Sequence, residues 1–177
     1  MSKTIEFEKV YLAKSLPTGI KEARSSLIRD IRIPQNSSNS HLRLRQKDDT
    51  YVITKKYPII DGDTSSQYEF TIELDKDEFN ALASCSDSYF VKRRFYMELA
   101  GRPAEVDVYQ EKLEGLVVID FEFDSEDQKN AFVTPDFVLA DVTAEEAIVG
   151  GFLSGKSFDE IFPLIKKYGY KKLEVNL

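Results

Sequence analysis

Polar and apolar side chains alternate along most of the chain up to about residue 124. Successive side chains of a β-strand point to opposite faces of a sheet, so this period of two predicts strands with one polar and one apolar face. Turn-forming residues separate the alternating segments. The expected strands cover residues 4–12, 27–34, 42–46, 50–56, 67–74, 89–99, 103–110 and 116–124. About eight antiparallel strands are enough to close into a barrel with a narrow interior.

One segment between these strands has a helical period. Asp75 has the character of a helix N-cap, and the segment DKDEFNALAS places Phe79 and Leu82 on one helical face. We therefore expect a short helix here that packs on the sheet through this apolar face.

The C-terminal stretch also changes to a helical period. Thr143 with Glu146, and Ser157 with Glu160, have the spacing of capping boxes. Gly169 is an expected helix stop. These signals predict two further helices after the last strand.

Length and composition favour one compact unit. The chain has 177 residues, of which 42% are hydrophobic and 12% aromatic, which is enough for one sizeable core. We expect a single domain over residues 1–177 of the α+β, mainly β class. Its predicted architecture is a closed eight-stranded antiparallel β-barrel with helices packed outside and a helical C-terminal extension over residues 141–177.

The polar faces of the expected strands carry charges of a single sign. Five of the expected strands present two acids or two bases spaced two apart, so both members of a pair share one face. Burying several ionised groups without partners costs many kcal/mol. We therefore expect these side chains to line an interior that admits water, where opposite charges pair or where an ion and a polyanion bind. The pairs are Glu6/Glu8, Arg43/Arg45, Lys92/Arg94, Glu105/Asp107 and Asp120/Glu122.

The two kinds of charge suit different ligands. Clustered carboxylates are the hard oxygen donors that Mg²⁺ or Mn²⁺ prefers, whereas His41 and Cys85 cannot by themselves make a zinc site. Arginine side chains are planar forks that match phosphate oxygens, and lysines add point charges. A divalent metal beside a set of bases is the usual arrangement for phosphoryl transfer.

The overall charge restricts the partners. A net charge of −7 and a pI near 4.9 disfavour a general nucleic-acid binder, because non-specific affinity for nucleic acid depends on Lys and Arg. A single cysteine excludes an internal disulfide, and the sequence shows neither a signal segment nor an apolar run that would span a bilayer. We expect a cytoplasmic protein without a nucleic-acid or membrane partner, either a monomer or a homodimer.

The charged motifs resemble those of a known family. The segments IEFEK, HLRLRQ, YVITKK, QYEFTIEL, VKRRF, AEVDVY and LVVIDFEF follow one another in the order seen in the CYTH family, also called triphosphate tunnel metalloenzymes. The resemblance covers roughly residues 3–143. It implies an eight-stranded antiparallel tunnel that binds a triphosphate-containing small molecule with Mg²⁺ or Mn²⁺. Members of the family include inorganic triphosphatases, thiamine triphosphatases and class IV adenylate cyclases.

The resemblance also implies roles for individual residues. Catalysis would depend on Glu8, Glu122, Lys56 and Arg94. The implied metal ligands are Glu6, Glu8, Glu69, Asp120 and Glu122, the implied phosphate-binding bases are Arg43, Arg45, Lys56, Lys92 and Arg94, and Glu105 and Asp107 are further tunnel acids.

Three departures from the family pattern leave the function open. Val10 stands where the first family motif has a lysine, Gln67 stands where an acid is expected, and AIVGG replaces the C-terminal tyrosine and asparagine motif. We expect a metal-dependent phosphohydrolase that cleaves inorganic triphosphate or a related triphosphate compound. The alternatives are a non-catalytic module that binds polyphosphate or nucleoside triphosphate, and a class IV adenylate cyclase.

Overall fold

In the part of the chain that the structure describes, nine strands form one antiparallel sheet. The computed structural model describes residues 7–35, 42–58, 67–148 and 150–175, and describes their side chains except at 56–58, 67–69 and 150. The strand order is β5-β4-β3-β2-β6-β7-β8-β1-β9, and every pairing is antiparallel. The strands are β1 (Phe7–Ala13), β2 (Ser25–Ile33), β3 (Leu42–Lys47), β4 (Thr50–Pro58), β5 (Gln67–Leu74), β6 (Tyr89–Leu99), β7 (Arg102–Tyr109), β8 (Val117–Phe123) and β9 (Val138–Asp141).

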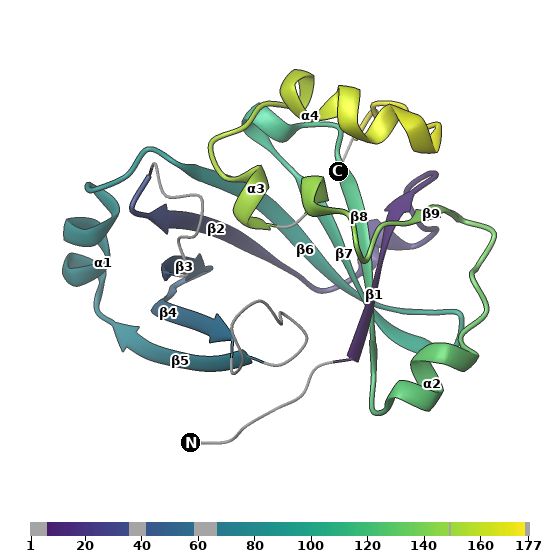
Figure 1. The fold of residues 1–177 in the computed structure, drawn as a ribbon, viewed down its shortest axis with the longest axis horizontal. Helices are drawn as coiled ribbons and strands as arrows, with labels where there is room; N and C mark the ends of the chain where they lie inside the picture. Colours follow the sequence, from purple (N-terminus) through teal and green to yellow (C-terminus); the bar gives the residue numbers. More distant parts are fainter. Residues whose placement is uncertain (1–6, 36–41, 59–66, 149, 176–177) are drawn as a thin grey trace.

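All eight predicted strands are present. The described residues form a ninth strand, β9, so the predicted count was too low by one. β9 was missed because its four residues, VLAD, are too few to show an alternating pattern; it forms by pairing with β1. The sheet is curved and twisted (Figure 1), and β5 and β9 lie at the two ends of its order. In the described residues these two strands do not pair, so the closed barrel stays a prediction.

The apolar face of the sheet is covered at two places. α1 (Lys76–Ala83) places Phe79 in a buried cluster with Ile31 and Leu44. Phe132, which follows α2 (Glu126–Ala131), packs on Phe121 with ring centroids 4.7 Å apart. Short 3₁₀ turns lie at Ile20–Glu22 (η1) and Glu111–Leu113 (η2). The predicted helix after Asp75 is therefore confirmed, and it contacts the sheet as expected.

The C-terminal helices cover one end of the opposite, charged face. They are η3 (Glu146–Ile148), α3 (Gly150–Leu153), α4 (Phe158–Ile165) and η4 (Lys166–Tyr168). Their apolar side chains pack with Leu12, Tyr109 and Val118, which have the parity of the charged residues on β1, β7 and β8. Among the described residues, none of the helices has both the length and the apolar character that a bilayer crossing needs.

The two predicted capping boxes have different outcomes. Glu160 accepts the backbone N–H of Ser157 at 2.8 Å, which confirms the box before α4. Thr143 does not cap a helix in this way. Its hydroxyl donates to Asp141 at 2.6 Å and accepts the backbone N–H of Val10 at 3.0 Å, so it ties this segment to β1.

Replacing Asp75 with alanine is expected to lower the free energy of unfolding by about 1 kcal/mol. The Asp75 carboxylate accepts the backbone N–H groups of Asp77 and Glu78, both at 2.8 Å, and these amides have no partner within the helix. Denaturant titration measures the loss. Asp49→Ala, in the exposed β3–β4 turn, is the matched control, and equal stability of the two variants would contradict the cap's role.

Candidate functional site

Acidic side chains of β1, β7 and β8 lie side by side on the charged face. Strand register places Glu8 directly opposite Glu122, and Asp120 directly opposite Glu105. Like charges directly opposite each other destabilise an antiparallel pair. Glu8 and Glu122 are exposed to solvent, whereas Asp120 and Glu105 are partly buried. A cation placed among these carboxylates would therefore relieve their mutual repulsion.

A buried ion network lies at the centre of this face. Asp107 on β7 is buried and accepts hydrogen bonds from Arg94 Nε and Nη2, both at 2.7 Å, and from Lys92 Nζ. Arg94 also forms ion pairs with Glu105 and, at 3.4 Å, with Asp120. Burial raises the pKa of Asp107, but Lys92 and Arg94 outweigh it and hold this pKa below its usual range. Two of the predicted phosphate-binding bases are therefore neutralised by acids of the neighbouring strands.

A second ion pair joins β2 to β3. Arg45 donates from Nε and Nη2 to the two oxygens of Asp30, each at 2.7 Å. Asp30 is only 3% exposed, and burial alone would raise its pKa. The hydrogen bonds and charge of Arg45 outweigh burial, so the pKa of Asp30 lies below its usual value. Asp30 was missed in the sequence because its strand has no second acid two residues away.

A base on β2 that the sequence analysis did not name also lies on the charged face. Arg32 lies two residues after Asp30, shares its face, and stands directly opposite Arg43 in the register of β2 and β3. The sequence indicates only that Arg32 and Asp30 share one face of their strand. Which residues stand opposite them becomes known only when the neighbouring strand is identified. Two arginines are therefore opposed across β2–β3 on the face that carries two opposed glutamates across β1–β8.

The basic and acidic groups lie close enough to change one another's pKa values. Asp30 experiences the charges of Arg43 and Lys92 besides that of Arg45. Asp120 is the group with the largest imbalance: burial, followed by the charge of Asp107, raises its pKa to about 8. Lys92 and Arg94 oppose this rise only in part. The position of Asp120 is therefore short of positive charge.

The structure thus gathers most of the predicted site residues on one face. Lys56 and Glu69 stand directly opposite each other in the β4–β5 register, but their side chains lie outside the described residues, as do Glu6 and His41. The predicted roles of Lys56, Glu69 and Glu6 stay predictions. The predicted residues whose side chains share the face are Glu8, Arg43, Arg45, Lys92, Arg94, Glu105, Asp107, Asp120 and Glu122.

Val10 has the parity of these residues but an apolar environment. It stands opposite Asp120 and is partly buried against the cluster beneath the C-terminal helices. This position is therefore part of the apolar packing at the covered end of the charged face.

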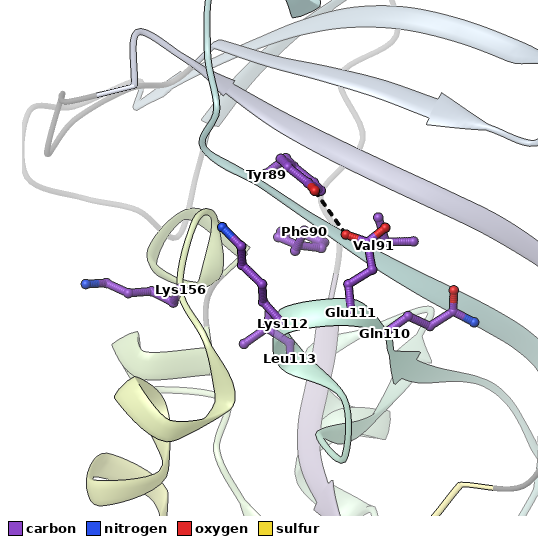
Figure 2. A pocket seen from close by; sticks show the side chains of 8 residues that line it. All are labelled: Tyr89, Phe90, Val91, Gln110, Glu111, Lys112, Leu113 and Lys156. Atoms are coloured by element: carbon purple, nitrogen blue, oxygen red, sulfur yellow. Dashed lines mark hydrogen bonds between the residues drawn. The ribbon is translucent and has the colours of Figure 1, made fainter.

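A cavity opens at the other end of the charged face. Its volume is about 480 Å³, and Arg24, Tyr96, Glu98, Glu105 and Glu122 are among its lining residues. Glu105 and Glu122 line this cavity and also belong to the acidic rows, by which we mean the opposed acids of β1, β7 and β8. Figure 2 shows a second hollow, near the start of β6, where the Tyr89 hydroxyl donates to Glu111 at 3.0 Å. That hollow has no room for a water molecule.

The sheet is curved and antiparallel, and one of its faces carries acids beside bases. These features define a class of protein that can bind a polyanion together with a cation. No family model matches the chain. An inorganic triphosphatase of Nitrosomonas europaea is 30% identical over 143 residues, which cover 80% of this chain and 91% of that protein. The chain therefore belongs to the CYTH family, the triphosphate tunnel metalloenzymes.

Solved structures agree with this fold. A crystal structure of an inorganic triphosphatase has a TM-score of 0.67 and 25% identity, and the match covers 87% of this chain and 97% of that one. A candidate adenylate cyclase from Bacillus halodurans has a TM-score of 0.52 at 16% identity, with 100% of this chain and 96% of that chain covered. The second likeness concerns the fold alone.

The family implies Mg²⁺ or Mn²⁺, and the residues fit such an ion. Glu8, Asp120 and Glu122 offer hard carboxylate oxygens, and the raised pKa of Asp120 marks a position that lacks positive charge. Among the side chains that the structure describes, no three acidic, histidine or cysteine groups gather closely enough to hold a metal by themselves. Mg²⁺ is usually bound by one or two carboxylates and completes its coordination with water and substrate phosphates. The donor set suits this mode of binding.

Proposed function

We propose that this chain, acting as one domain, is a metal-dependent phosphohydrolase that cleaves inorganic triphosphate or a related triphosphate compound within a charged β-tunnel. The observation that carries the proposal is the juxtaposition, on one sheet face, of the opposed acids Glu8 and Glu122 with the bases of β2, β3 and β6. The relative in Nitrosomonas europaea, named an inorganic triphosphatase, supports the same reaction class.

The arginines of the charged face are held in place by acids. Arg45 binds Asp30 through Nε and Nη2, so the Nη1 side of its guanidinium points away from that acid. Arg94 is fixed more fully, because its Nε and Nη2 bind Asp107 and its Nη1 pairs with Glu105, so a phosphate group would displace Glu105 to reach it. Because these acids restrict the rotamers of the arginines, phosphate binding costs less side-chain entropy than it would with mobile bases. Lys92 adds positive charge at the centre of the face.

The acidic rows would hold the metal through Glu8, Asp120 and Glu122. A bound Mg²⁺ or Mn²⁺ supplies positive charge that stabilises the phosphate oxygens during phosphoryl transfer. The residues of the chain orient the triphosphate across the sheet, with bases at the β2–β3 side and acids at the β1–β8 side. Positioning and charge neutralisation are the main contributions that this reaction needs from a protein.

A second candidate function is a module that binds polyphosphate or nucleoside triphosphate without cleaving it. The observation that favours it is Val10, which packs in an apolar cluster where the family motif has a lysine. Compared with the family motif, β1 lacks one positive charge on the charged face. The bases Lys92 and Arg94 are already paired with Asp107. Binding depends on the total charge, whereas turnover depends on each group being placed correctly.

Phosphate release from inorganic triphosphate, ATP and thiamine triphosphate, measured with Mg²⁺ and with Mn²⁺, tests the proposal. We expect release from inorganic triphosphate that is abolished by EDTA. If calorimetry shows metal-dependent binding but none of the three compounds releases phosphate, the chain is a binding module and not an enzyme. Cyclic AMP formed from ATP would indicate a cyclase.

Val10→Lys is the informative variant for this comparison. A lysine has a flexible stem that reaches past apolar neighbours to water, so we expect the fold to tolerate it. A chain that binds triphosphate without cleaving it, and that gains release with Val10→Lys, would show that the absent charge limits catalysis. Val133→Lys is the matched control: it adds the same charge at an exposed position after α2.

A further inference from the structure

Two carboxylates hold Arg94 by different edges of its guanidinium. Asp107 accepts hydrogen bonds from Nε and Nη2, both at 2.7 Å, whereas Nη1 pairs with Glu105. The side chain of Asp107 is 2% exposed and also pairs with Lys92, whereas that of Glu105 is 22% exposed and longer by one methylene group. Removing Glu105 from Arg94 leaves no buried charge without a partner, because Asp107 stays bound. Glu105 is therefore the acid that can be exchanged.

The carboxylate of Glu105 has a second place to go. Glu105 lines the cavity of about 480 Å³ together with Glu122, and strand register places it directly opposite Asp120. A change of side-chain rotamer is enough to turn the carboxylate from Arg94 into this cavity, with no movement of β7. Like charges directly opposite each other destabilise an antiparallel pair, so this second position is favourable only with a cation nearby.

A phosphate group is a strong competitor for the Nη1 edge of Arg94. Phosphate oxygens match the planar N–H donors of a guanidinium, and a phosphate group carries more negative charge than a carboxylate. Asp107 binds the opposite edge, so Arg94 keeps its orientation while the partner of Nη1 changes. The exchange of Glu105 for phosphate therefore leaves the buried ion pair intact.

We infer that Glu105 couples metal binding to triphosphate binding: a phosphate group replaces it at Nη1 of Arg94, and its carboxylate turns into the cavity towards Mg²⁺ or Mn²⁺. The inference rests on the proposed function and concerns the same site. Both ligands favour the same position of Glu105, so each tightens the binding of the other, and this coupling is reciprocal.

Calorimetric titration of the full chain with inorganic triphosphate, once in EDTA and once with Mg²⁺, tests the inference. In EDTA, Glu105→Gln should bind triphosphate at least about fivefold more tightly than the wild type, because a neutral amide competes less for Arg94 than a carboxylate. With Mg²⁺ the variant should lose this advantage, since an amide is the weaker metal ligand. The ratio of Kd in EDTA to Kd with Mg²⁺ should therefore be at least about fivefold smaller in the variant.

Glu98→Gln is the matched control. Glu98 lines the same cavity and lies on the same face of β6 as Arg94, but about 13 Å further along the strand. The control removes the same charge from the same cavity, and its ratio of Kd values should stay within about twofold of the wild type. Glu105→Asp keeps the charge and shortens the reach to Arg94. It should also bind more tightly in EDTA, which an effect of net charge would not produce.

The outcomes separate this inference from the proposed function. A wild type that binds no triphosphate with Mg²⁺ overturns the proposed function itself. If the wild type binds and Glu105→Gln has the same ratio of Kd values as Glu98→Gln, the coupling through Glu105 alone is overturned. It is also overturned if Glu105→Gln binds more tightly in EDTA and still gains fully from Mg²⁺. Should Glu105→Gln fail to fold, Glu105→Asp decides the question by the same comparison with Glu98→Gln.

Discussion

Replacing Glu122 with glutamine is expected to lower metal-dependent phosphate release at least about 100-fold, since changes to groups that only support metal ligands already cost 10- to 100-fold. Glu122 stands directly opposite Glu8 and lines the cavity of about 480 Å³. Glutamine keeps the shape of the side chain and removes its negative charge, so a cation loses one of two opposed carboxylates. Steady-state phosphate release with saturating Mg²⁺ measures the loss.

The stability of the same variant distinguishes loss of metal binding from loss of fold. Without metal, Glu122→Gln should keep a Tm close to that of the wild type, because the side chain at position 122 is exposed to solvent. Added Mg²⁺ should raise the Tm of the wild type but not that of the variant, since only a bound ligand stabilises the folded state. Glu114→Gln, at an exposed position before β8, is the control. Full activity in Glu122→Gln would remove this residue from the site.

Replacing Asp107 with asparagine is expected to lower the free energy of unfolding by about 3–5 kcal/mol, which is typical when one partner of a buried ion pair is removed. Lys92 is 6% exposed and its Nζ pairs with Asp107, so its charge would stay buried without that carboxylate. Arg94 would keep its contacts with Glu105 and Asp120. Denaturant titration at neutral pH measures the loss, with the exposed Asp124→Asn as control. A change below about 1 kcal/mol, as for a surface pair, would contradict this account.

The pH dependence gives an independent check on Asp107. Because its pKa is lowered in the folded state, its carboxylate stabilises the fold above its ordinary value of 3.8, and this contribution is lost as the pH falls below that value. The wild type should therefore lose stability more steeply in acid than Asp107→Asn, and the two proteins should converge there. A constant difference between them down to acidic pH would argue against an ionised Asp107.

Much of the charged face could be read from the alternation of side chains. The pairs Asp120/Glu122 and Lys92/Arg94 have the same parity on their strands, and parity alone decides which face a side chain takes. The cap at Asp75 was also predictable, because its hydrogen bonds run to residues two and three positions later. Interactions of this kind depend on local geometry, which short sequence patterns determine.

Other features depend on which strands become neighbours. The role of Asp30 depends on Arg45, fifteen residues away, and that of Asp107 on Lys92 and Arg94 of the neighbouring strand. β9 exists because β1 offers it an unpaired edge. The pattern of a single strand does not specify these partners, because register and crossing segments are set by the packing of the whole chain.

By itself, the sequence determined that this protein has alternating strands with acids and bases collected on one face, since the direction of each side chain follows from the period of the strand. Only the tertiary structure decided which charges neutralise one another, which glutamates and arginines are opposed across strands, and where Val10 joins the apolar packing. The physical reason is that Coulomb energy and burial depend on distances between residues far apart in the chain, and those distances arise only when the sheet is assembled.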